Sequence, residues 1–247
     1  MTKSRFAFAL AALLIASRSF AIGPEVEYEK ADIDPGNIAS LQRGARNFMN
    51  YCSGCHSAKY VRFNTIGKQL ELSDDQLIKN LMFNADKTFE TINASMKPED
   101  ATRWYGKAPP DLSLMARAKG ADYIYTFLKS FYIDPSRPTG VNNIALPSTA
   151  MPDVLWELQG YQDAVFLEHT VEGVTEKKFE HFEQKIPGKL DEKDYDAFVR
   201  DTVNFLAYIS EPIRAERRKL GVWVLMYLLV FFIIAYMLKK QIWKDVE

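Results

Sequence analysis

The stretch NYCSGCH, residues 50–56, decides what kind of fold this chain forms. It contains the pattern C-x-x-C-H, which is typical of covalent attachment of a c-type haem. Two thiols at this spacing can add across the two vinyl groups of one porphyrin, and the next residue supplies an imidazole under the iron. We therefore expect one haem c, attached through Cys52 and Cys55, with His56 as a ligand of its iron.

Two other uses of a C-x-x-C pair are disfavoured by its surroundings. A thiol redox motif belongs near a βαβ pattern, whereas residues 38–51, IASLQRGARNFMNY, carry apolar side chains at helical spacing. A zinc site needs four ligands, and the chain has only two cysteines. The haem interpretation is therefore favoured.

The composition limits the class of protein. The 247 residues are 47% hydrophobic and 26% charged, as expected for a chain that buries a core. The 31 basic and 32 acidic residues give a net charge of −1, which argues against a nucleic-acid partner, because phosphate binding needs clustered Lys and Arg.

The first 21 residues have the pattern of a secretory signal peptide. Lys3 and Arg5 precede an apolar run over residues 6–16, and Ser19-Phe20-Ala21 fits a cleavage site. The alternative is a retained anchor, but the run is shorter than the roughly 20 residues that span a bilayer. We expect residues 1–21 to be removed.

Residues 220–238 predict a transmembrane helix. These 19 residues carry no charge and have basic residues on both sides, and as a helix they would cover about 28 Å. Basic residues are more numerous before the span than after it, which taken alone would place the N-terminal part in the cytoplasm. The export of a long domain is, however, largely independent of such flanking charge. We expect a periplasmic haem domain over 22–213, an anchor with its flanks over 214–240 in the bacterial inner membrane, and a cytoplasmic tail over 241–247.

The remaining pattern predicts a mainly α-helical, class I-like c-type cytochrome domain with a small inserted β-hairpin. An apolar face on the last soluble helix is expected to pack across the first helix. The hairpin is expected to pair 164–167 with 178–182 across Glu172-Gly173. The expected helices are 37–51, 73–83, 111–119 with Asp111 as N-cap, 121–131, a short piece at 154–158, and 192–209, with a loop over 134–151.

The sixth iron ligand has several candidates: Met49, Met82, Met96, Met115, Met151, His169 and His181. Met49 is too near the attachment motif, and Met82 and Met115 fall in helical stretches where Met is usually core filler. The two histidines lie in a charged stretch and are expected at the surface. Met96 and Met151 remain, both in loop-like sequence near Pro.

Five segments, spanning nearly the whole mature chain, resemble the cytochrome c1 family. They are RGARNFMNYCSGCHSAKYVRF (43–63), APPDLSLMARAKGADYIYTFL (108–128), RPTGVNNIALPSTAMPDVLWELQG (137–160), DAFVRDTVNFLAYISEP (196–212) and the anchor that ends in WKDV (243–246). The family provides haem subunits of ubiquinol:cytochrome c oxidoreductase, the cytochrome bc1 complex, and the likeness is to its shorter proteobacterial form.

The resemblance implies a role for several residues. It implies thioethers at Cys52 and Cys55, His56 as proximal ligand and Met151 as distal ligand. The carbonyl of Pro110 would accept the imidazole N–H. Contacts to the haem propionates are implied for Arg117 and Tyr123, whose alternative interpretation is an exposed helix face.

The resemblance also implies a function. The chain would be no enzyme on its own, but an electron-transfer subunit of a proton-translocating complex, passing one electron from the Rieske iron-sulfur protein to a soluble or membrane-attached c-type cytochrome. Its other implied partners are cytochrome b, the lipid bilayer and a second copy of the complex. The alternatives are a stand-alone anchored cytochrome c and a haem sensor or oxygen-handling enzyme with an open sixth position.

Charge is distributed unevenly along the chain. Residues 153–201 hold 13 acidic and 6 basic residues, a net of −7, whereas 41–130 hold 13 basic and 9 acidic, a net of +4. One hypothesis is that the acidic segment steers a basic soluble cytochrome toward the haem edge. The alternative is an ordinary solvated surface.

Overall fold

The fold is known from a computed structural model, which describes residues 26–171 and 174–245. The expected signal peptide, the turn at Glu172-Gly173 and the last two residues lie outside the described residues. The helices are α2 (Ile38–Tyr51), α3 (Phe63–Gln69), α4 (Asp74–Asn80), α5 (Pro98–Tyr105), α6 (Met115–Lys119), α7 (Ala121–Lys129), α8 (Trp156–Gln159), α9 (Glu192–Ser210) and α10 (Arg214–Ile242), followed by a 3-10 turn (Trp243–Asp245). The strands are β1 (Ala58–Arg62), β2 (Thr91–Ile92), β3 (Phe131–Ile133), β4 (Val141–Asn143), β5 (Gly160–Val171) and β6 (Val174–Pro187).

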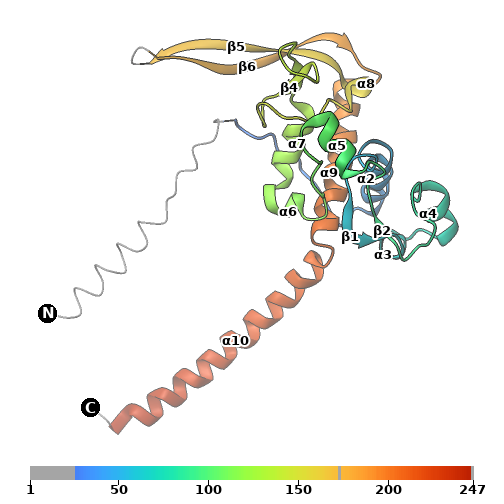
Figure 1. The fold of residues 1–247 in the computed structure, drawn as a ribbon. Coiled ribbons are helices and arrows are strands. Elements are labelled where there is room, and N and C mark those ends of the chain that lie inside the picture. Colours follow the sequence, from blue (N-terminus) through green and yellow to red (C-terminus); the bar gives the residue numbers. More distant parts are fainter. Residues whose placement is uncertain (1–25, 172–173, 246–247) are drawn as a thin grey trace.

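Helices α2 and α9 cross at the centre of the fold (Figure 1). The side chains of Phe48 and Phe205 are fully buried between them, with ring centroids 5.7 Å apart. Gly44 lies at the closest approach, where a Cβ would be 2.0 Å from the carbonyl oxygen of Asp201. The predicted packing of the last soluble helix across the first is confirmed, and it depends on this glycine.

A polar network beside this crossing joins the same two helices. Asp201 is buried and accepts from Ser40 Oγ at 2.6 Å and from Arg43 Nη2 at 2.9 Å. Asn204 Nδ2 donates to Ser40 Oγ at 2.8 Å. These hydrogen bonds run from one helix to the other, and they fix the register of the crossing.

The structure corrects several expected boundaries. The helix expected over 111–119 begins only at Met115, because Asp111 accepts from main-chain N–H groups outside any helix. The helix expected over 73–83 ends at Asn80, and the one expected over 121–131 ends at Lys129. The loop expected over 134–151 contains strand β4, which pairs with β3. The β1–β2 pair and helices α3 and α5 were not predicted from the sequence.

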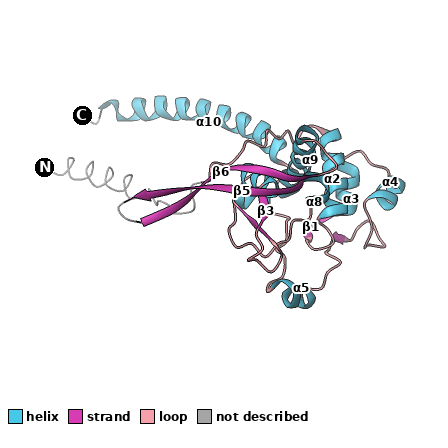
Figure 2. Ribbon diagram, turned by 90° about the horizontal axis from the view of Figure 1, so that it is seen from above, coloured by secondary structure: helices cyan, strands magenta, loops and turns pink. Residues whose placement is uncertain are grey.

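The inserted hairpin is confirmed and is much longer than expected. Strands β5 and β6 have 12 and 14 residues and pair antiparallel, and the pairs Phe166–Phe179 and Leu167–Lys178 fall within the two segments that were predicted to pair. Figures 1 and 2 show it projecting from the helical body as an arm. Its base is held by Gln162, whose Nε2 donates to the carbonyl oxygen of Phe131 at 2.8 Å.

Helix α10 leaves the body as a separate rod (Figure 1). It contains the one helical segment of the described residues that is long and apolar enough to cross a membrane, Glu216–Ile242, and none of its most apolar stretch is buried in the protein. Its base is held by ion pairs from Arg214 and Arg217 to Glu211.

Candidate functional site

A mostly apolar cavity lies between the attachment motif, helices α7 and α9, and the loop that follows β4. Its walls bring together segments that are more than 90 residues apart in the sequence. The residues that line it are Tyr51, Cys52, Cys55, His56, Tyr105, Lys107, Ala108, Pro109, Pro110, Leu112, Met115, Tyr123, Ile124, Phe127, Leu128, Leu146, Thr149, Ala150, Met151, Pro152, Val154, Thr202 and Leu206.

His56 is oriented by one hydrogen bond. Its Nδ1 lies 2.7 Å from the carbonyl oxygen of Pro110. A carbonyl oxygen only accepts, so Nδ1 carries the proton and the lone pair of Nε2 is free. Burial lowers the pKa of His56, although the bond to Pro110 and the charge of Asp111 oppose that shift. The imidazole is therefore neutral at pH 7, as a metal ligand must be.

The two thiols follow directly after α2. The helix ends at Tyr51, and a turn with Cys55 N–H bonded to the carbonyl oxygen of Cys52 at 3.1 Å brings both side chains to the cavity wall. Burial raises the pKa of the Cys52 thiol to about 12 and also raises that of Cys55. Both are therefore protonated thiols at pH 7.

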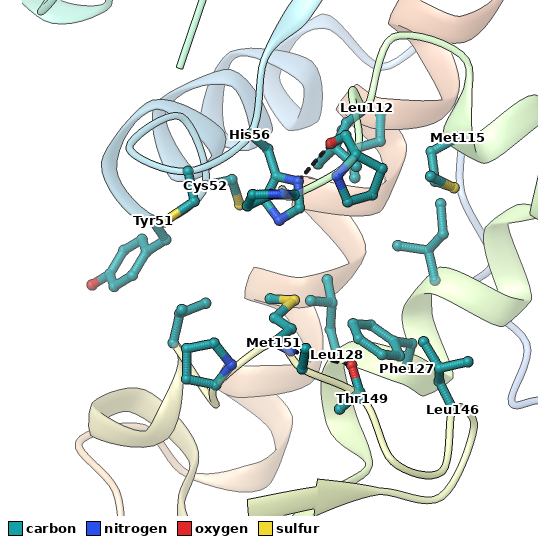
Figure 3. Close-up of a pocket in the computed structure, with 18 of the residues that line it drawn as sticks. Tyr51, Cys52, His56, Leu112, Met115, Phe127, Leu128, Leu146, Thr149 and Met151 are labelled. Carbon is teal, nitrogen blue, oxygen red and sulfur yellow. Dashed lines mark hydrogen bonds between the residues drawn. The ribbon is translucent and has the colours of Figure 1, made fainter. Parts of the chain in front are cut away.

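Met151 faces His56 across the cavity (Figure 3). Its main-chain N–H donates to Thr149 Oγ1 at 3.3 Å, within the loop that follows β4. Met96, the other loop candidate, does not line the cavity, although its N–H donates to the carbonyl oxygen of Gly54. Of the two candidates that residue patterns left open, only Met151 faces the imidazole.

Among the other candidate ligands, Met115, which was expected as core filler, packs against the core and also lines the cavity. Met49 and Met82 are buried in the core. His181 is exposed beside Glu180 and Glu183. The side chain of His169 is outside the described part of the chain.

The two residues expected near the propionates are placed differently. Tyr123 lines the cavity and stacks on Phe127, with centroids 6.2 Å apart. Arg117 is exposed on α6 and borders a second hollow that it shares with Tyr123, Lys119 and Arg214. The structure thus brings Tyr123 to the cavity and leaves Arg117 outside it.

Sequence reasoning missed most of the apolar wall. Ile124, Phe127 and Leu128 on α7 and Leu206 on α9 line the cavity, yet as apolar residues at helical spacing they resemble ordinary core. Their sequence carries no signal that separates a cofactor wall from a core. These residues are distinguished from core residues only in the structure, where α7 and α9 line the same cavity.

The donor set fits a c-type haem. A porphyrin needs apolar walls for its faces, two thiols at one edge for attachment, and one axial donor on each face. The cavity offers Cys52 and Cys55, the free Nε2 of His56, and the sulfur of Met151 on the opposite side (Figure 3).

Asp153, two residues after Met151, is expected to make the stability of the fold depend on pH. Burial raises its pKa to about 6, against two main-chain bonds that lower it. The folded state therefore binds this proton more tightly than the unfolded chain. The resulting stability is complete below the ordinary pKa of 3.8 and is lost as pH rises through about 6.

We expect Asp153→Asn to remove this dependence. Relative to the variant, the wild-type free energy of unfolding should fall by about 2 to 3 kcal/mol between pH 4 and pH 7. Denaturant unfolding of both proteins across that range measures the difference, with Glu157→Gln as a control for loss of charge. Parallel curves for the wild type and Asp153→Asn would contradict the prediction.

Comparison with known proteins gives a consistent family. The model of the Cytochrome C1 family matches residues 79–170 and 190–246. Cytochrome c1 of Allochromatium vinosum is 45% identical over 95% of this chain and 96% of its own length. The mitochondrial cytochrome c1 haem protein of Saccharomyces cerevisiae is 25% identical over 85% of this chain and 68% of its own.

A further relative has a different name. A protein of Nitrosomonas europaea, called the gamma subunit of ammonia monooxygenase, is 40% identical over 96% of this chain and 97% of its own length.

Proposed function

Because this chain belongs to the cytochrome c1 family, and is therefore a haem-carrying electron-transfer subunit, we propose how its own residues perform that task. Members of the family bind covalent haem c. The single observation that carries the proposal is the apolar cavity with two thiols and a neutral imidazole on one side and a Met sulfur on the other. When bound, the haem supplies a one-electron ferric/ferrous couple.

Four residues are proposed to hold the group. The thiols of Cys52 and Cys55 would each form one carbon–sulfur bond by addition of S–H across a vinyl group of the haem, so that the cofactor could not dissociate. The Nε2 of His56 and the sulfur of Met151 are the proposed axial donors. A thioether donor favours the ferrous state and raises the potential, which suits a carrier at the oxidising end of a chain.

The remaining walls control orientation and water. The Pro110 carbonyl fixes the tautomer and the plane of the His56 ring. Apolar side chains of α7 and α9 exclude water, which disfavours the added positive charge of the oxidised state. We further propose that Tyr123 contacts a propionate, and that Arg117 does so through the hollow that both residues border.

We propose that the chain crosses the membrane once, with the haem domain on one side and a short tail on the other. The exposed apolar surface of α10 supports an anchor with its flanks over 214–240. We further propose a signal peptide over 1–21, a periplasmic haem domain over 22–213 and a cytoplasmic tail over 241–247. Protease added to intact spheroplasts should cleave the haem domain and spare an epitope tag on the tail. Cleavage of the tag alone would reverse the orientation.

The proposed electron path runs from the Rieske protein to a c-type cytochrome, within a dimeric complex that contains cytochrome b and that as a whole is a proton-translocating enzyme. Extraction in mild detergent with an affinity tag on the chain tests this assembly. We expect a cytochrome b and a Rieske protein to co-purify. Isolation alone would favour a stand-alone anchored cytochrome, and isolation with monooxygenase subunits would support the role that the Nitrosomonas relative's name implies.

The alternative function is that of a haem sensor or oxygen-handling enzyme, in which the sixth coordination position of the iron is open. The ferric optical spectrum separates it, because iron–thioether coordination gives a weak red charge-transfer band that a five-coordinate haem lacks. Binding of carbon monoxide by the reduced wild type would favour the sensor.

Electrostatic steering by the acidic segment is a further proposal. Glu180 and Glu183 are exposed on the β5–β6 arm. With both changed to Gln, we expect electron transfer to a basic soluble cytochrome to slow about threefold at low salt and to depend less on salt. Stopped-flow reduction rates over a salt series measure this. Asp74 and Asp75 on α4, far from the arm in Figures 1 and 2, provide the matched control, and equal salt dependence in both variants would exclude the arm.

A further inference from the structure

Asp111 uses both carboxylate oxygens to bind main-chain N–H groups. Its Oδ2 accepts from the N–H of Lys59 at 2.9 Å, and its Oδ1 accepts from the N–H of Ser113 at 2.9 Å. Lys59 lies three residues after His56, whereas Asp111 follows Pro110 directly. One side chain thus joins the two segments that hold the imidazole and its hydrogen-bond acceptor.

Two further bonds complete this bracket. The N–H of Leu112 donates to the carbonyl oxygen of Ser57 at 2.8 Å. Ser113 is fully buried, and its Oγ accepts from the N–H of Tyr60 at 3.1 Å. We use the term bracket for these four bonds, of which three join residues 57–60 to residues 111–113 and the fourth lies within 111–113.

The bracket provides hydrogen bonds where main-chain pairing does not fix the chain. Pro109 and Pro110 have no N–H group, so they cannot be fixed by donors of their own. Strand β1 pairs with β2 only at Ala58 and Arg62. The N–H groups of Lys59 and Tyr60, which lie between those pairs, therefore receive side-chain acceptors instead.

We propose that Asp111 is a positioning residue, which holds the Pro110 carbonyl against the Nδ1–H of His56 and so sets the donor strength and ring orientation of the imidazole. The inference rests on the proposed function, which makes His56 an axial ligand. A bond to the far nitrogen of a ligating imidazole fixes the ring and raises its basicity. If the Pro110 carbonyl moves away, the imidazole donates less charge, the ferric state loses stability, and the reduction potential rises.

Three variants of the full chain test this. At the wild-type midpoint potential, we expect Asp111→Ala to lower the ferric-to-ferrous ratio about tenfold, equivalent to about 59 mV for one electron. Asp111→Asn retains one acceptor oxygen and should give an intermediate shift. Ser113→Ala removes one bond of the bracket without changing charge and should shift the ratio in the same direction. Potentiometric titration measures these shifts, and electron paramagnetic resonance of the ferric protein reports the ring orientation.

Lys59→Ala is the matched control. Its donor is the main-chain N–H, so the bracket stays intact, and any effect of the lost positive charge has the opposite sign. If loss of the Asp111 charge alone acted, Asp111→Asn would equal Asp111→Ala and Ser113→Ala would equal the wild type, which would overturn the proposal. A lower melting temperature with unchanged potential and resonance spectrum in all three variants would also overturn it. Absence of His–Met ligation in the wild type would instead refute the proposed axial ligands.

Discussion

Replacing Met151 with Leu is expected to leave the haem covalently attached and to lower its reduction potential by on the order of 0.2 V. The thioethers at Cys52 and Cys55 do not involve Met151, so attachment survives. Leucine fills a similar volume but has no lone pair, so the ferrous state loses its soft ligand. Potentiometric titration and the loss of the iron–thioether charge-transfer band measure the effect.

Met115 provides the matched control for this change. It lines the same cavity, and the same Met→Leu substitution there removes a sulfur that does not face His56 (Figure 3). We expect its potential to stay near that of the wild type. A Met151→Leu protein with an unchanged potential would assign the distal position to another residue.

The second large effect is expected from Gly44→Ala. Alanine would ordinarily stabilise a helix interior by about 1 kcal/mol relative to glycine. Here the new Cβ would lie 2.0 Å from the carbonyl oxygen of Asp201 and 2.7 Å from Cβ of Phe205. Both are rigid parts of α9, so the helices must separate, and we expect a net loss of about 3 kcal/mol.

Thermal unfolding of the detergent-solubilised protein, with haem retention as a second readout, measures this loss. Gly221→Ala on α10 is the control, because it also places alanine in a helix and, beyond the backbone of that helix, no atom of the described residues lies within 4 Å of its added Cβ. If both variants unfold with the wild type, the α2–α9 contact contributes less than the structure implies.

Much of the fold could be predicted because its signals are local. The apolar face of α9 and the helix before Cys52 follow from spacing alone, and both were found within one residue of their ends. Prediction failed where distant contacts replace local ones. Asp111 has the sequence of a helix N-cap, but the N–H of Lys59, 52 residues away, binds its carboxylate instead. Strand β2 has two residues, too few to show an alternating pattern.

The candidate site divides in the same way. Cys52, Cys55 and His56 are recognised from five consecutive residues, because their chemistry depends on spacing along the chain. Arg117 and Tyr123, six residues apart, appeared equivalent in sequence. The structure places Tyr123 at the cavity and Arg117 outside it. The reason is that the two residues lie on separate helices, Arg117 on α6 and Tyr123 on α7, and these helices are oriented differently toward the cavity.

By itself, the sequence determined the means of attaching the cofactor and the presence of a membrane span, since each depends only on neighbouring residues. Residue patterns left Met96 and Met151 open and the family resemblance favoured Met151; the tertiary structure then placed Met151, 95 residues after His56, opposite the imidazole and kept Met96 away from the cavity. The physical reason is that the Met151 loop is positioned by β4 and α8, which pack on other parts of the fold. A side chain's distance from an iron held elsewhere is a property of that packing and of no local pattern.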